Sequence, residues 1–119
     1  MATALKRKLS GSTDGRGIKV VATASAGTTI HTAVAGTTAG TYDEIWLYAY
    51  NSDTSVRTLT IEFGGTTAPD DNIKIALEAQ AGLVLVVSGL ILQNGDVVKA
   101  FADAANVVVI FGFVNAITD

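Results

Sequence analysis

Cysteine is absent from this chain of 119 residues, and histidine, proline and tryptophan each occur once. Without cysteine the chain can form no disulfide bond and supplies no thiolate. A single histidine leaves the usual zinc and transition-metal ligand sets incomplete within one chain. These absences argue against thiolate chemistry and against the usual zinc and transition-metal sites, and we expect no catalytic residues, no metal and no cofactor.

Charged residues are also scarce, at 16% of the chain against about 25% in ordinary domains, and the formal net charge is −3. Mean hydropathy is correspondingly high, at +0.41. The longest nearly apolar run, residues 82–92, has half of the ~20 residues of a membrane-spanning helix, and Ser88 and Gly89 interrupt it. The N-terminal segment has no apolar stretch after its charges, so no secretory signal is expected. We therefore expect a chain made in the cytoplasm, with no membrane partner and a surplus of apolar side chains.

Short β-branched, aromatic and other apolar runs, separated by turn residues roughly every 10–12 positions, are typical of an all-β protein. The pair Asn94-Gly95 supplies the two positive φ angles of a type I′ hairpin turn. No long segment has the period of a helix. The sequence therefore predicts an antiparallel β-sandwich of about eight strands, with jelly-roll connectivity as one option. The predicted strands cover residues 18–23, 28–34, 42–51, 56–63, 73–78, 83–87, 97–102 and 107–114.

The first fifteen residues differ from the rest of the chain. They follow neither the helical nor the strand period, and Gly11 and Gly15 disfavour regular structure there. We therefore predict two parts, a flexible N-terminal arm over residues 1–15 and a β-sandwich domain over residues 16–119.

The arm carries the only basic cluster of the chain, Lys6-Arg7-Lys8. The other five of the eight Lys and Arg residues are outnumbered by eleven acids, so we expect no basic surface and no nucleic-acid partner. One interpretation is that charge keeps a flexible arm solvated. The hypothesis that we carry forward is that the arm docks on an acidic protein partner, with two leucines as apolar anchors, through Leu5, Lys6, Arg7, Lys8 and Leu9.

Three of the predicted strands, 42–51, 83–87 and 107–114, are apolar on both faces. A two-layer sandwich buries only one face of each strand, whereas strands that are apolar on both faces normally belong to a sheet covered on both sides. We therefore predict that the second face is a closed, symmetric interface between chains, formed by Trp46, Tyr48, Tyr50, Phe111 and Phe113. The other interpretation is that loops 35–40 and 64–71 cover one central strand, although their glycine and threonine content makes them a poor apolar cover.

His31 and the run Asp70-Asp71-Asn72 are the remaining candidates for chemistry. As a catalytic base, His31 would need a nucleophile and an orienting acid from elsewhere in the fold. We expect instead that it faces solvent or makes a satisfied polar contact. The acidic run lacks the spacing of an EF-hand loop and is expected to be a solvated turn. Other acids, such as Asp43 and Glu62, are expected mostly at turns or on polar strand faces.

The C-terminal third combines a strand, a Gly-Asp-Val turn, a second strand, an Ala-Asn turn and a valine-rich strand that leads into Gly-Phe-Val. Residues 82–119 read GLVLVVSGLILQNGDVVKAFADAANVVVIFGFVNAITD. This pattern, with an arm followed by a β-domain, resembles the head decoration (cement) proteins and similar small virion structural proteins of tailed bacteriophages.

The resemblance implies a function and a location. The function is that of a structural virion protein, not an enzyme, that binds the outer capsid surface and stabilises the shell by bridging major capsid protein subunits. The location is the capsid exterior, after synthesis in the host cytoplasm. Such proteins self-associate, and we expect a homotrimer, with a dimer as the alternative.

Two other functions remain open at this point. Exposed aromatic side chains such as Tyr48 and Tyr50 would suit stacking on sugar rings, in a carbohydrate- or receptor-binding module of a phage fibre, tail or neck. A hydrolase of an unrecognised type would need a cleft with clustered acids.

Overall fold

The structure is a computed structural model that describes residues 2–119. In that range the chain forms strands, turns and loops, and it has no helix long and apolar enough to span a bilayer. The strands are β1 (Thr3–Lys8), β2 (Ile18–Lys19), β3 (Thr28–Thr32), β4 (Tyr42–Asn51), β5 (Arg57–Phe63), β6 (Asn72–Leu77), β7 (Val84–Leu92), β8 (Val97–Ala102) and β9 (Val108–Thr118).

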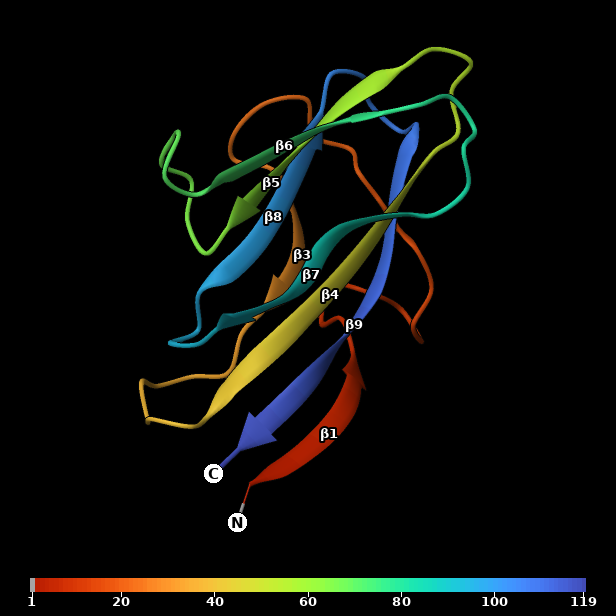
Figure 1. The fold of residues 1–119 in the computed structure, drawn as a ribbon. Helices are drawn as coiled ribbons and strands as arrows, with labels where there is room; N and C mark the ends of the chain where they lie inside the picture. Colours follow the sequence, from red (N-terminus) through yellow and green to blue (C-terminus); the bar gives the residue numbers. More distant parts are fainter. Residues whose placement is uncertain (1) are drawn as a thin grey trace.

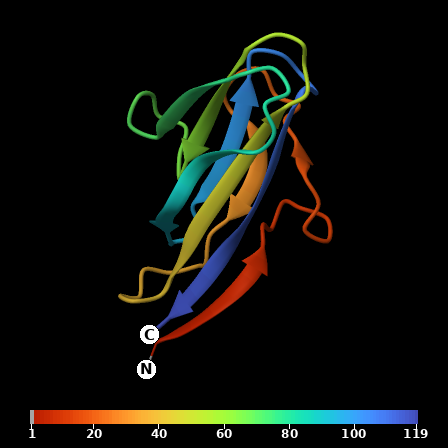
Figure 2. The ribbon, with the colours of Figure 1, turned by 45° about the vertical axis from the view of Figure 1, so that its right-hand side comes forward.

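The strands form two antiparallel sheets that pack face to face (Figure 1 and Figure 2). Sheet A has the order β1-β9-β4-β7, with β2 also paired to β9, and sheet B has the order β3-β8-β5-β6. The predicted antiparallel β-sandwich is confirmed. When β1 and β2 are counted as one interrupted strand along β9, the order of strands in the two sheets is that of a jelly roll.

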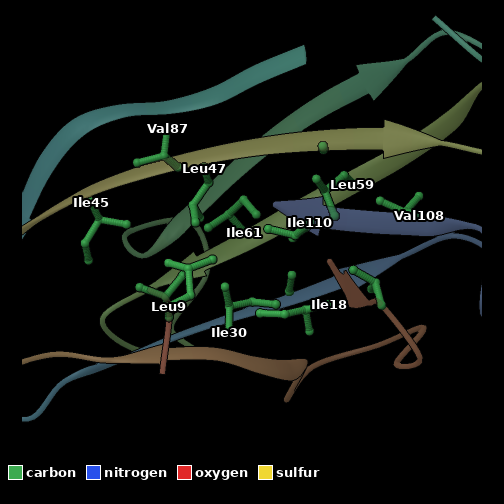
Figure 3. Close-up of a cluster of buried hydrophobic side chains, with 14 of the residues drawn as sticks. Leu9, Ile18, Ile30, Ile45, Leu47, Leu59, Ile61, Val87, Val108 and Ile110 are labelled. Carbon is green, nitrogen blue, oxygen red and sulfur yellow. The ribbon is translucent and has the colours of Figure 1, made fainter. Parts of the chain in front are cut away.

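The core lies between the sheets and consists of the inward-pointing residues of each strand. From sheet A, Ile45, Leu47 and Ala49 of β4 are fully buried, and Leu59 and Ile61 of β5 meet them from sheet B (Figure 3). Burial of each leucine or isoleucine side chain contributes roughly 1.5–3 kcal/mol. The alternation of apolar residues along β4 therefore determines which face of the strand turns inward.

Strand β7 extends beyond its predicted end at residue 87, because a bulge accommodates the glycine that interrupts the apolar run. The register between β4 and β7 shifts between Ile45 and Trp46, so that Gly89 has no directly opposite partner. Such a bulge adds one residue without ending the pairing, and the strand continues to Leu92.

Strand β2, in contrast, ends at Lys19, well before the predicted limit at residue 23. The main-chain N–H groups of Val21 and Ala22 both donate to the hydroxyl of Thr28, at 3.1 Å each. A side-chain acceptor thus replaces the carbonyl of a neighbouring strand, which is how threonine competes with sheet structure.

The N-terminal segment contains a strand, contrary to the expectation that residues 1–15 lack regular structure. β1 pairs with β9 from Thr3 opposite Thr118 to Lys8 opposite Phe113. β9 continues past its predicted end at residue 114, so its edge offers main-chain partners that the local sequence of β1 does not reveal. Leu9, directly after β1, is 1% exposed and belongs to the core, which ties the strand to the sandwich.

β1 and the C-terminal end of β9 reach beyond the rest of the sandwich at one end of the molecule (Figure 1). All six residues of β1 are exposed. The described chain is accordingly elongated, with principal extents of 48 × 27 × 21 Å, and its two termini lie side by side.

The inward row of β4 should dominate the stability of the fold. L47A removes a fully buried side chain between the sheets and should lower the free energy of unfolding by about 2–5 kcal/mol in chemical denaturation. L83A is the matched control: Leu83 is 58% exposed, and its truncation should cost less than about 1 kcal/mol. Equal losses in the two variants would contradict the assignment of the inward face.

Candidate functional site

The outward side of sheet A carries a row of aromatic residues, which we call the aromatic face: Trp46, Tyr48, Tyr50, Phe111 and Phe113. β4 and β9 place them in cross-strand pairs, with Trp46 opposite Phe113 and Tyr48 opposite Phe111. All five are partly exposed. The structure therefore brings together on one face the residues that the sequence predicts as an interface.

Stacking and a cation order one end of the aromatic face. The rings of Trp46 and Phe113 stack with centroids 6.2 Å apart and planes 12° from parallel. The Nζ of Lys6 lies 4.4 Å from the centroid of the Phe113 ring, within cation–π range. These contacts connect β1, β9 and β4 through their side chains as well as through their main chains.

Glu44 fixes the polar edge of Trp46. Its Oε1 accepts hydrogen bonds from the indole Nε1–H of Trp46 at 2.8 Å and from the Nδ2 of Asn115 at 3.0 Å. Both bonds favour the carboxylate, so they hold the pKa of Glu44 below its ordinary value, with the Trp46 bond as the larger cause. The tryptophan ring is thus held in one orientation on the face.

The strands on either side of β9 and β4 differ sharply in character. β1 contributes Lys6 and Lys8 to the outward side, opposite Asn115 and Phe113. β7 contributes Leu85 and Ile91, which are 45% and 56% exposed. The aromatic face therefore has a cationic border on one side and an apolar border on the other.

The area of this outward side suits a protein partner. Four strands about 4.8 Å apart and about ten residues long at ~3.4 Å per residue cover roughly 600 Å². A stable protein interface buries about 800 Å² on each partner. The outward side of sheet A thus has most of the area that such an interface requires, without any contribution from sheet B.

The outward side of sheet B is mainly polar. Thr58 and Thr60 of β5 share it with Lys74 of β6 and Lys99 of β8. Glu62, also on this side, accepts hydrogen bonds from the hydroxyl of Ser25 and from the main-chain N–H of Gly27, which hold residues 25–27 across the sheet. The two outward sides therefore differ in chemistry: that of sheet A carries the five residues of the aromatic face, whereas that of sheet B carries Phe101 among polar side chains.

A second cluster of polar side chains lies between β3 of sheet B and β4 of sheet A, next to the segment that follows β1. His31 and Asp43 are buried, at 4% and 6% exposure, with the Nε2 of His31 2.7 Å from Oδ2 of Asp43. The main-chain N–H of Ser10 donates to Nδ1 of His31 at 3.0 Å. Because Nδ1 accepts this hydrogen bond, it carries no proton. Nε2 therefore bears the ring proton and donates a hydrogen bond to Oδ2 of Asp43.

These side chains line a cleft of about 630 Å³ that also includes Arg7. A serine, a histidine and an aspartate meet here, but their hydrogen bonds do not suit nucleophilic catalysis. Nδ1 of His31 already accepts a hydrogen bond from the main-chain N–H of Ser10. Oγ of Ser10 accepts a hydrogen bond from the main-chain N–H of Thr32 at 2.7 Å. The geometry is that of a buried junction that joins the segment after β1 to β3 and β4.

The junction shows where prediction from sequence succeeded and failed. The expectation of a satisfied polar contact for His31 is confirmed. The expectation that acids such as Asp43 and Glu62 lie mostly at turns or on polar strand faces did not include their burial, at 6% and 1% exposure. The strict alternation of β4 is the signal that could have identified Asp43, because it shares the inward row with Ile45 and Leu47.

The structure also places the residues of the predicted binding arm. Lys6 and Lys8 face the aromatic side of sheet A, while Leu5 and Arg7 face the other side, opposite Ala116 and Val114. Leu9 is buried in the core and holds β1 to its own domain, so in this conformation it is no anchor for a partner. The exposed part of the predicted arm is therefore the strand itself.

Residues 2–119 contain no group of three His, Cys, Asp or Glu side chains arranged to hold a metal ion. Comparison with protein-family models, with curated proteins and with solved structures finds no match to the chain.

W46F should raise the pKa of Glu44 toward its ordinary value of 4.5, because it removes the indole N–H and keeps an aromatic ring. A carboxyl group whose pKa is lower in the folded state than in the unfolded state stabilises the fold when the pH is above its unfolded-state pKa. This contribution to stability is lost as the pH falls through the folded-state pKa. W46F should therefore lose less stability in acid than the parent chain does. Carboxyl ¹³C NMR titration measures the shift.

Asp53 is the internal control for this titration, because its lowered pKa results mainly from a hydrogen bond with Arg57. Asp53 should titrate identically in both proteins. An unchanged Glu44 titration in W46F would contradict the role of the indole.

H31A leaves the buried Asp43 carboxylate without its donor and should cost about 3–5 kcal/mol of unfolding free energy in urea denaturation. D70A, which removes an exposed acid, should stay within about 0.5 kcal/mol of the parent chain. In ¹⁵N NMR the one imidazole should carry its proton on Nε2. A proton on Nδ1 would contradict the hydrogen-bond arrangement.

Proposed function

We propose that this chain is a structural protein that packs its aromatic face against other protein chains, and that its setting is the exterior of a viral capsid. The observation that carries the proposal is the partly exposed row of aromatic residues on β4 and β9, on the side of sheet A away from sheet B. In this role the chain bridges major capsid protein subunits and stabilises the shell.

The physical support begins with the order of the aromatic face. Trp46 is stacked on Phe113 and hydrogen-bonded to Glu44, so part of each ring is already covered within the chain. An ordered aromatic patch loses little conformational freedom when it binds, which favours affinity. Aromatic side chains of this kind are also enriched at the centres of protein interfaces.

The border of the face adds a preference for the sign of the partner's charge. Lys6, Arg7 and Lys8 lie on an exposed strand of a chain whose net charge is −3. An acidic surface beside the aromatic contact would complement β1 and would speed the encounter. On a shell with many equivalent sites, modest contacts of this kind add through multivalency.

Self-association belongs to the same proposal. Soluble oligomers are mostly closed and symmetric. A homotrimer is the state that the resemblance to decoration proteins implies, with a dimer as the alternative. The jelly-roll order of strands is compatible with a virion protein, although this fold also serves lectins and does not by itself specify function.

A carbohydrate- or receptor-binding module is the second candidate. The observation that favours it is that Tyr48 and Tyr50 are neighbours on the outward row of β4, where partly exposed rings could stack on a sugar. It differs from the first candidate in the chemistry of its ligand, so one set of variants tests both.

Y48K places a charge at the centre of the aromatic face and should abolish co-sedimentation with shells assembled from the major capsid protein of the same source. A76K is the control, because Ala76 is exposed on a strand of sheet B and its substitution should leave binding unchanged. Wild-type binding by Y48K would contradict the proposal. Binding to a glycan array that Y48K abolishes, with no binding to shells, would favour the second candidate.

A further inference from the structure

The two sheets have four edges, formed by the interrupted strand β1/β2 and by β7 in sheet A, and by β3 and β6 in sheet B. β2, which shares the edge of β1 along β9, has only two residues. An unprotected edge is a template for pairing with another chain, so proteins usually block edges with charges, short strands or covering segments. The way in which each of these edges is protected shows where a second chain can add.

Three of the edges carry a clear protection. β1 has three consecutive cations, Lys6-Arg7-Lys8. The edge of β3 is covered by the segment after β1, since Gly11 N–H donates to the carbonyl of Ile30 at 2.9 Å and Ser10 accepts from Thr32. β6 has six residues, includes the exposed Lys74 and follows the acids of loop 64–71.

The fourth edge, β7, has neither charge nor cover. It has nine residues, and no ionisable side chain occurs from residue 82 to residue 93. Within the described chain, no main-chain hydrogen bond outside the sheet ladders involves residues 84–92. Its side chains include Leu85, Leu90 and Ile91, which are 45%, 45% and 56% exposed. Two shifts of register with β4 twist the strand without covering it.

We infer that β7 pairs antiparallel with β7 of a second copy of this chain, so that sheet A continues across a two-fold axis. This inference rests on the self-association that belongs to the proposed function, and it selects the dimer over the homotrimer, because a two-fold axis relates two chains. It identifies a second copy as the partner because a neutral strand opposes no like charges when it pairs with itself. The same pairing of β1 would place its three cations opposite those of the second copy, which is unfavourable.

The positions of the outward residues on β7 specify the register. Leu85, Ser88 and Ile91 lie opposite Tyr48, Trp46 and Glu44, so all three are on the outward side of sheet A. An axis at Ser88 pairs Leu85 with Ile91 of the second copy, and Ile91 with Leu85 of the second copy. The two aromatic faces then join across the axis into one surface that is twice as wide.

This register permits a charge-exchange experiment with light scattering over a range of protein concentrations. The double variant L85K/I91K places like charges opposite each other at both ends of the paired strands. Its mass should fall from that of a dimer to the 12.2 kDa of one chain. The double variant L85K/I91E places opposite charges at the same positions and should keep the dimer, since antiparallel cross-strand pairs of opposite charge attract.

V56K is the matched control for these variants. Val56 is 49% exposed directly before β5 of sheet B, and its substitution should leave the mass unchanged. Within one chain, positions 85 and 91 are separated by roughly 20 Å along the strand, so their charges act between copies rather than within one copy.

Each outcome bears on the inference separately from the proposed function. If L85K/I91K keeps the mass of the parent chain while Y48K dissociates, self-association stands and the β7 pairing is wrong. If both β7 double variants dissociate equally, the two-fold register is wrong, and β7 instead meets a face or an extended segment of another chain. If the parent chain stays at 12.2 kDa at every concentration, both the pairing and the self-association are wrong.

Discussion

One constraint shapes this molecule: the neighbouring strands β4 and β9 are apolar on both sides, and sheet B can cover only one of those sides. β4 and β9 pair over ten residues at the centre of sheet A. Their inward rows, with Leu47 and Ile110 among them, form the core against sheet B. Their outward rows have no second layer, so the fold satisfies the hydrophobic effect on one side and leaves an aromatic surface on the other.

The remaining features of the fold arrange polar groups around this asymmetry. Sheet B carries mainly polar residues on its outward side, where Lys74 is exposed and Glu62 is buried against residues 25–27. The buried polar groups have specific partners, as in the pairing of His31 with Asp43 and the two hydrogen bonds accepted by Glu62. Charge is concentrated on β1, while β7 has none, so the two edges of sheet A differ as strongly as its two sides. The surface features on which the proposed function depends are therefore concentrated on sheet A.

Much of the sandwich could be predicted from local pattern. The alternation of Ile45, Leu47 and Ala49 with three aromatic residues predicts both the strand and its two faces, because the period of a strand is two residues. These predictions succeeded because they depend on residues that are close together in sequence, and on burial, which the residue types report directly. The pairing of Trp46 with Phe113 was not among them, because it requires β4 and β9 to be neighbours in the sheet.

The errors concern contacts that only the tertiary structure creates. β1 forms because the distant end of β9 offers it an edge, and nothing in the composition of residues 3–8 signals that. Leu9 was expected to anchor a partner, yet it is the first core residue, because β1 brings it over the sandwich. The partnership of His31 with Asp43 likewise depends on how β3 and β4, in different sheets, cross at the open end of the sandwich.

The central claim is that another protein covers the outward side of sheet A, and hydroxyl-radical footprinting with mass-spectrometric readout measures this most directly. Oxidation of Trp46, Tyr48 and Phe113 in the free chain is compared with their oxidation on capsid shells. Phe101, which is partly exposed on the outward side of sheet B, serves as the internal reference. The account predicts protection of the three residues on sheet A and an unchanged Phe101. Protection of Phe101 with continued oxidation of Trp46 and Tyr48 would contradict it.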